Sequence, residues 1–214
     1  MFAYFAKHSD MLMGAFCEHL RIVAVVLVLS VVLASVLSYL LLQSEKAANL
    51  VIQIFSAIYS IPSLALFAML IPIFGLGNAT AFPVLVAYNQ YLLIRNFMSG
   101  LQNVDKSLLE AGTGMGMSHW QLVTRVQIPL AMPSIIAGIR LAIISTTGIA
   151  TIAATINAGG LGKILLSGMR TMNVYKISWG MILSIIIALI ADLALKRLEK
   201  LTENKNHAGG AAAR

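Results

Sequence analysis

The chain has 214 residues, of which 59% are hydrophobic and 11% charged, and its mean hydropathy is +0.87. A soluble domain carries about 25% charged residues, so this composition excludes an ordinary water-soluble globule and a disordered chain. Cys17 is the single cysteine and excludes an internal disulfide framework. The net charge of +7 does not indicate nucleic acid, because the basic residues lie between and after long apolar runs. A polytopic membrane protein is the class that remains.

Residues 1–20 are predicted to form an amphipathic helix that lies in the membrane interface and leads into the first span. Apolar residues recur there at three-, four- or seven-residue steps, with charged residues between them. The apolar residues are Phe2, Phe5, Leu12, Phe16 and Leu20, and the polar ones are Lys7, His8, Asp10 and Glu18.

An all-α transmembrane domain with about five membrane-spanning helices is predicted for residues 21–200. At about 1.5 Å per residue, each run can cross or nearly cross a hydrocarbon layer of about 30 Å. The expected spans are residues 22–42, 50–74, 82–100, 131–156 and 177–195.

Two of these spans carry unusual residues. Pro62 and Pro72 lie in the second run and predict that it is bent or divided, because proline removes a backbone donor. Asn89, Gln90 and Arg95 lie in the third run, which we therefore expect to face protein or a polar cavity rather than lipid.

The distribution of basic residues predicts the orientation in the membrane. Ten of the fifteen Lys and Arg residues fall on one side of the five spans, which places the C-terminus in the cytoplasm and the N-terminus outside. The external segment 158–176 still carries three basic residues, so a re-entrant segment or a sixth short span stays open. Residues 201–214 are predicted to be a disordered tail.

The cytoplasmic segment between the third and fourth spans is predicted to form two short helices. Ser107 with Glu110 and Ser118 with Gln121 have the spacing of capping boxes. Such short helices are not stable alone in water, so they must dock on the membrane helices or on a partner. Glycines 112, 114 and 116 separate the two helices, and Pro129 is expected to end the second.

This segment resembles the cytoplasmic-loop signature of ABC-importer permeases, which is E-A-A-x-x-x-G, nine residues, then I-x-L-P. The spacing is fully kept, with Gly112 in place of the second alanine and with Val126 and Ile128 at the aliphatic positions. Residues 61–77 and 156–162 resemble segments of permeases that import glycine betaine, carnitine, choline and related quaternary amines. The likeness covers roughly residues 18–198.

The resemblance implies a permease of a bacterial cell membrane that works with a second permease subunit, with two ATPase subunits and with an extracellular solute-binding protein. A coupling helix around 118–125 would dock in the ATPase. The residues implied for this coupling are Glu110, Ala111, Gly112, Gly116, Ser118, Trp120, Arg125 and Pro129. Trp120 is the expected apolar anchor, unless it packs on the chain's own helices.

No catalytic activity, cofactor or metal is expected for the chain itself. Gly162-Lys163 lacks the Ser or Thr that follows in a Walker A motif, so ATP hydrolysis is assigned to a partner. An intramembrane enzyme is disfavoured, because all four histidines are expected outside the spans and no hydrolase motif occurs. A self-contained channel or ion-coupled carrier stays as an alternative, as does an importer of another small solute such as an amino acid.

Candidates for the solute path come from residue chemistry. Aromatic faces attract a quaternary ammonium, and amides can bind a carboxylate or hydroxyl, although interface anchoring and helix–helix bonding explain the same residues. The aromatic candidates are Tyr59, Tyr88 and Tyr91, and the amide candidates are Asn89, Gln90 and Asn157. Gly159, Gly160 and Gly162 are expected to form either an external gate or a helix-ending turn.

Two further patterns concern helix packing. Ser30, Ala34 and Ser38 are small residues at four-residue spacing, which lets helices approach closely within one chain or between two. Asp192 precedes Lys196 by four residues and is expected to form an ion pair with it on one helix face.

Overall fold

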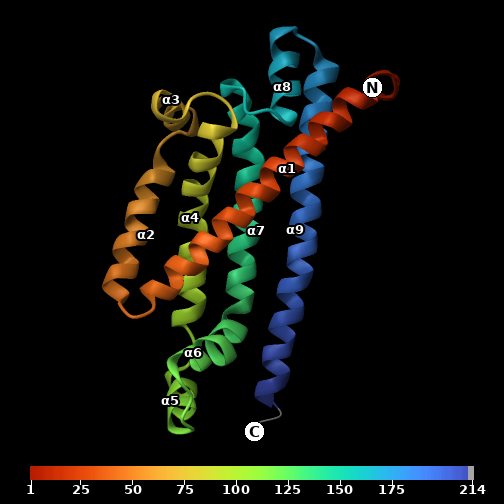
Figure 1. Ribbon diagram of the computed structural model, residues 1–214. Helices are drawn as coiled ribbons and strands as arrows, with labels where there is room; N and C mark the ends of the chain where they lie inside the picture. The colour runs from red at the N-terminus through yellow and green to blue at the C-terminus, as the bar shows by residue number, and fades with distance from the viewer. Residues whose placement is uncertain (212–214) are drawn as a thin grey trace.

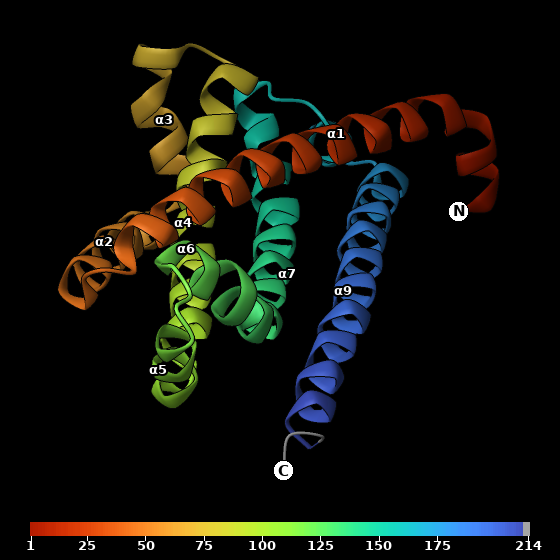
Figure 2. The same ribbon diagram turned by 60° about the horizontal axis from the view of Figure 1, so that its bottom comes forward.

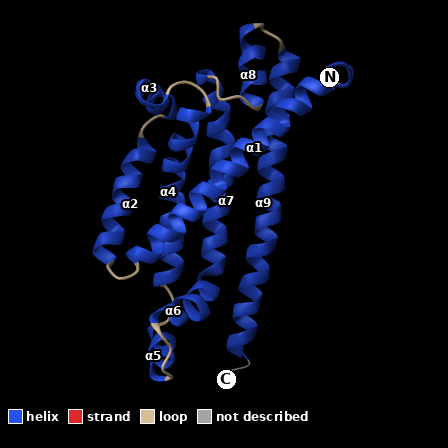
Figure 3. Cartoon of the chain, in the orientation of Figure 1, coloured by secondary structure: helices blue, strands red, loops and turns tan. Residues whose placement is uncertain are grey.

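A computed structural model describes residues 1–211, and within them it contains helices, turns and loops but no strand (Figures 1 and 3). Helices α4 (Asn78–Gln102) and α7 (Ile128–Ile152) pack together at the centre of the molecule. Helix α9 (Val174–Ala211) packs on α7, and α2 (Glu45–Ser60) packs on α4. Helix α1 (Phe2–Leu41) crosses α4, α7 and α9 obliquely, as Figures 1 and 2 show. The predicted all-α class is confirmed.

The N-terminal segment is not a separate interfacial helix. Helix α1 is kinked at His8, where φ is −126° and ψ is 23°, and from there it continues past residue 20 to Leu41. Leu12 and Ala15 are buried against Leu161 and Ile164 of α8 and against residues of α9. The apolar stripe that suggested a membrane surface is thus partly covered by the protein's own C-terminal half.

The second predicted span is divided at Pro62, as expected. Helices α2 and α3 (Ser63–Phe74) meet at an angle of 97°. Ile61 precedes the proline and adopts an extended conformation (φ −69°, ψ 133°), because proline disfavours a helical residue before it. Pro72 lies inside α3, which continues to Phe74.

The prediction that the third span faces protein is confirmed. Helix α4 contacts α1, α2, α3 and α7, and Asn89 and Gln90 are fully buried. It has 25 residues, which corresponds to about 37 Å. Of the described helices, three are long and apolar enough to span a membrane, or four if α2 and α3 form one bent span. The polar residues of α4 keep it out of that count, so five spans remain a prediction.

The small residues of α1 serve packing within the chain. Ser30, Ala34 and Ser38 are all buried, and Ala34 lies in a core cluster with Leu93 and Phe97 of α4. The close helix approach predicted from their spacing is therefore made with α4 and its neighbours, without requiring a second copy.

The second half of the chain differs from prediction in two places, and it excludes one alternative that was left open for 158–176. Pro129 does not end a helix, because α6 (His119–Leu122) passes through a π-helical turn, η1 (Val123–Gln127), into α7, with Pro129 in the first turn of α7. Helix α8 (Leu161–Arg170) has 10 residues, too few for a sixth span. Helix α9 continues to Ala211, so the predicted tail is helical there, and its residues 212–214 lie outside the described residues.

Candidate functional site

The predicted coupling segment lies at one end of the bundle. Helices α5 (Lys106–Gly114) and α6 project beyond α4 and α7 at the end that also carries the C-terminal end of α9, while the N-terminus, α3 and α8 lie at the other end (Figure 1). Most of the predicted coupling side chains are exposed here. They are Glu110, Ala111, Gly116, Ser118, Trp120, Arg125 and Pro129, whereas Gly112 is buried.

Local hydrogen bonds shape the two short helices. The Ser118–Gln121 capping box is confirmed: Gln121 N–H donates to Ser118 Oγ (3.3 Å), and Ser118 N–H donates to Gln121 Oε1 (2.8 Å). The capping box predicted for Ser107 is wrong. A Ser107 cap would start the helix at residue 108, whereas α5 starts at Lys106. Asp105 is the N-cap, and its Oδ1 accepts from Ser107 N–H at 2.9 Å. This bond lowers the pKa of the exposed Asp105 carboxyl.

Gly112 is where the two short helices touch. A Cβ added to it would meet Leu122 Cδ2 at 2.5 Å and Met117 Sδ at 3.2 Å. Gly116 makes the turn between the helices with φ +79°, a conformation that favours glycine. The glycine that departs from the family signature at 112 therefore permits close contact between α5 and the residues that follow it, and it does not interrupt α5.

Trp120 packs only in part on the chain's own helices. Its ring packs edge-on against Tyr39 of α1 with centroids 5.6 Å apart. The residue nevertheless remains 61% exposed, so most of its surface is free for a partner. Tyr39 also lies near His119, with centroids 6.3 Å apart. Helix α6 is thus tied to the C-terminal end of α1 while its outer face stays open.

The three candidate tyrosines form one aromatic cluster between α2 and α4. Tyr59 lies 5.6 Å from Tyr88 and 5.2 Å from Tyr91, measured between ring centroids. Tyr88 is buried, and its hydroxyl donates to the Ile61 carbonyl at 2.6 Å. This bond satisfies an acceptor at the break between α2 and α3, which gives Tyr88 a structural role. Tyr91 accepts a hydrogen bond from Arg95 Nη1 at 2.6 Å.

The two central amides bond to neighbouring helices. Asn89 Nδ2 donates to Ser30 Oγ (3.1 Å) and to Thr146 Oγ1 (2.8 Å), which links α4 to α1 and α7. Gln90 Nε2 donates to the Ser30 carbonyl at 3.3 Å, while its buried Oε1 has no hydrogen-bond partner. The sequence allowed either solute binding or hydrogen bonding between helices for these amides. Hydrogen bonding between helices accounts for Asn89 and for the amide nitrogen of Gln90.

The glycine-rich turn after α7 is packed tightly against α1. The short η2 helix (Ala153–Ile156) ends at Asn157, which has φ +68°, and Gly159 and Gly160 also have positive φ. A Cβ on Gly160 would meet His19 Nδ1 at 2.8 Å, and a Cβ on Gly162 would overlap the Thr151 carbonyl oxygen. These glycines are required by close packing and by backbone conformation.

Glu18 holds the same turn from α1. Its Oε2 accepts from Gly160 N–H at 2.8 Å, and its Oε1 lies 3.3 Å from Lys163 Nζ. Among the described residues no side chain caps α8, and the Glu18 carboxylate instead binds the backbone N–H of Gly160, the residue before the helix. Sequence reasoning missed Glu18 and also His19, which was expected outside the spans but is fully buried within α1. No local pattern relates these residues to a turn more than 130 positions later.

A polar hollow of about 430 Å³ opens beside this turn. Asn157, Lys163, Ser167 and Arg170 are among its lining residues. Asn157 is exposed and lies at the opposite end of α7 from the coupling segment, so it does not join Asn89 and Gln90 in one site. The hollow presents two basic side chains, one of which is paired with Glu18.

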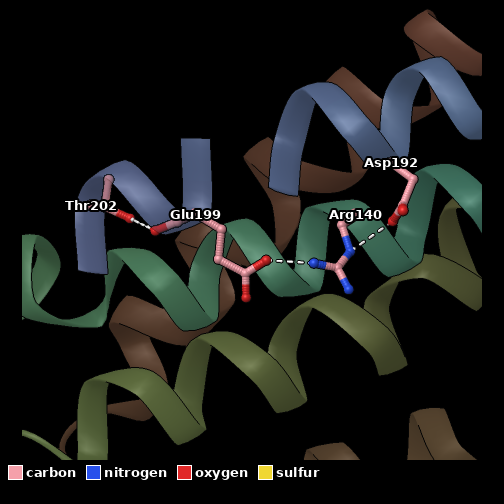
Figure 4. A network of polar contacts seen from close by, with 4 residues as sticks. All are labelled: Arg140, Asp192, Glu199 and Thr202. Carbon is pink, nitrogen blue, oxygen red and sulfur yellow. Dashed lines mark hydrogen bonds and ion pairs between the residues drawn. The ribbon is translucent and has the colours of Figure 1, made fainter. Parts of the chain in front are cut away.

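A network of ionic contacts ties α7 to α9. Arg140 Nε lies 2.8 Å from Asp192 Oδ1, and Arg140 Nη1 lies 2.5 Å from Glu199 Oε2 (Figure 4). Thr202 donates its hydroxyl to the Glu199 backbone carbonyl at 2.7 Å. The expectation that Asp192 pairs with Lys196 is wrong, because Asp192 turns towards the guanidinium on the neighbouring helix.

Comparison with known proteins agrees with this architecture. Residues 27–205 match the family described as binding-protein-dependent transport system inner membrane component. The chain belongs to this family. The permease is 37% identical to the carnitine transport permease protein OpuCB of Listeria monocytogenes over 92% of this chain and 90% of that one. It is also 37% identical to the glycine betaine/carnitine/choline permease protein OpuCB of Bacillus subtilis, over 86% of this chain and 84% of that one.

A solved structure shares the fold of the permease. The inward-facing MetNI methionine ABC transporter has a chain that superposes with a TM-score of 0.80, covering 92% of this chain and 98% of that one. The sequence identity is 22%, so this likeness concerns the fold. The resemblance predicted from the 110–129 signature is thus confirmed by independent matches over most of the chain.

Proposed function

We propose that the chain is the transmembrane permease subunit of an ATP-driven ABC importer for a small osmoprotectant of the quaternary-amine class, such as glycine betaine, carnitine or a choline-like solute. The observation that carries this proposal is the exposed segment 110–129, which keeps the coupling signature and projects from one end of the bundle. The relatives named for carnitine and glycine betaine supply the solute class.

The partner ATPase docks on α5, α6 and the turn between them. Trp120 offers an exposed ring as an apolar anchor, and Glu110 of α5 and Arg125 of η1 offer exposed charges in the same segment. Because α6 continues through η1 into α7, a rigid-body movement of α6 would be passed directly to a central helix. This end then faces the cytoplasm, with the C-terminus, and the N-terminus lies outside, as the distribution of basic residues predicts.

A second permease subunit, a copy or a paralogue, completes the solute path, because one bundle of this size cannot enclose a polar pathway away from lipid. The proposed path includes the Tyr59 and Tyr91 rings, each partly exposed, which can contact a quaternary ammonium. The hollow with Lys163 and Arg170 lies at the proposed external end and fits acidic side chains of the solute-binding protein.

Site-directed crosslinking tests the coupling surface. In a Cys17→Ser background, His119→Cys is expected to crosslink to an ATPase subunit in native membranes, since residue 119 is exposed on α6. Met172→Cys is the matched control, because residue 172 is 85% exposed and lies in the turn between α8 and α9, at the opposite end. A complex that retains its ATPase but gives no adduct at position 119 would refute the proposed docking surface.

A further inference from the structure

An apolar groove of about 430 Å³ lies beside the coupling segment. It is formed by the C-terminal part of α1, by α4 and by the continuous α6–η1–α7 segment. Val36, Leu40, Phe97, Val123, Met132 and Ile135 are among its lining residues, and the lining is almost entirely apolar. The proposed solute path does not use this groove, and the coupling surface shares only Trp120 with it.

The groove opens onto an apolar stripe of α1. Val28, Val32, Val36 and Leu40 follow one another at four-residue steps and are 62%, 60%, 53% and 64% exposed. Residues four apart lie on one helix face, and Val36 and Leu40 belong to both the stripe and the groove. In a chain of an inner-membrane family, such a stripe faces the hydrocarbon of the bilayer, and the groove continues that surface into the protein.

Two aromatic side chains also line the groove. Tyr39 and Trp120, which contact each other, lie at the same groove, and such aromatic residues concentrate at the level of lipid headgroups and ester groups.

We propose that the groove binds one acyl chain of a membrane phospholipid. The apolar lining takes the chain, and the exposed stripe of α1 gives it a continuous route from the bilayer. Tyr39 and Trp120 lie where the ester and headgroup of such a lipid would be. The bound chain lies against Val123 and Met132, where the coupling segment joins α7.

Photolabelling of the assembled transporter tests this site. The complex is purified through a tag on this chain and placed in bilayers of phosphatidylethanolamine and phosphatidylglycerol that contain a phosphatidylcholine with a diazirine in one acyl chain. We expect adducts on residues of the groove, such as Met132 and Ile135, at higher yield than on Ile190, which is 62% exposed on α9. The adducts are mapped by mass spectrometry.

Two tryptophan variants make the test specific. Ser35→Trp places a large side chain at an exposed position that lines the groove, and it is expected to abolish the groove adducts. Val28→Trp lies on the same stripe but outside the groove, and it is expected to leave those adducts unchanged. Groove labelling no higher than at Ile190, labelling that persists in Ser35→Trp, or burial of the groove by a partner subunit in a solved complex would each overturn the proposal.

Discussion

At the scale of single residues, the glycines of the turn between α7 and α8 have roles that the structure separates clearly. Gly159 and Gly160 are needed for their positive φ and for contact with Glu18 and His19, while Gly162 is needed because it lies against the Thr151 carbonyl. The sequence identified this cluster as a turn or a gate. Only the three-dimensional contacts show that α1 holds it in place.

Gly162→Ala is expected to destabilise the permease. The new methyl group would overlap a backbone oxygen, which cannot move aside as a flexible side chain could, and overpacking of this kind costs about 1–3 kcal/mol. Gly148→Ala is the matched control, because nothing lies within 4 Å of its Cβ position in α7. Thermal unfolding in detergent should show a lower Tm for Gly162→Ala only. Equal Tm values for the two variants would contradict this packing.

The capping role of Asp105 predicts a pH dependence of α5. Hydrogen bonds from Ser107 lower the pKa of Asp105 in the folded chain. A depressed pKa means that this stabilising contribution is present above the carboxyl's ordinary pKa and is lost as the pH falls through the lowered value. Hydrogen exchange of residues 106–114 should therefore accelerate relative to the rest of the bundle at acidic pH.

Asp105→Asn separates the charge from the cap. Asparagine also caps helices well. In this variant we therefore expect slow hydrogen exchange in α5 at neutral pH and no acceleration of that exchange at acidic pH. Asp105→Ala should lose protection at all pH values. If Asp105→Asn keeps the full acid response, another group controls it.

At the scale of elements, α7 connects the coupling segment, the central amide contacts and the ionic network with α9. The π-helical turn η1 lies between α6 and α7, and π-helical turns inside α-helices occur frequently at functional sites. The sequence placed a break at Pro129, but this residue directly follows the π-helical turn, where the α-helical hydrogen-bond pattern is already altered. The chain therefore continues as helix past this proline.

The Arg140–Asp192 contact is expected to stabilise the packing of α7 on α9. Both side chains are about three-tenths exposed, so a double-mutant cycle of Arg140→Ala and Asp192→Ala should give a coupling energy of about 0.5–1 kcal/mol. The cycle is measured by thermal or denaturant unfolding of the purified protein. The same cycle with Lys196→Ala in place of Arg140→Ala should give no coupling. Coupling of Asp192 to Lys196 instead would contradict the network in Figure 4.

Sequence patterns within a few residues predicted some local features of the fold but not the contacts between distant helices. The break at Pro62 and the Ser118 capping box were predicted because each depends on residues within four positions. Other contacts join segments far apart in sequence: Asp192 with Arg140, Glu18 with Gly160, and Asn89 with Ser30 and Thr146. Helical periodicity gives the faces of a helix but not its neighbours, so these contacts could not be predicted.

At the scale of the whole molecule, the predicted class and family are confirmed, while the N-terminal segment is partly covered by protein. Composition identifies membrane helices because an apolar run must be covered by lipid or protein. It does not tell which of the two covers it, and residues 2–20 illustrate this, since α8 and α9 cover part of their apolar face. Helix α4 shows the reverse case. It lies at the centre of the bundle and is covered by other helices, so it carries polar residues, and its hydropathy is too low for it to be counted as a span.

The most direct test of the central proposal is uptake by the intact transporter in sealed proteoliposomes. The complex is purified through a tag on this chain, and radiolabelled glycine betaine or carnitine is supplied outside with its binding protein, with ATP inside or absent. We predict accumulation against a gradient only when ATP is present, with strong loss in a Trp120→Ala, Arg125→Glu double variant that still inserts and folds. Accumulation that needs no ATP, or that follows an imposed ion gradient in a preparation without an ATPase, would show a channel or ion-coupled carrier and would contradict the proposed function.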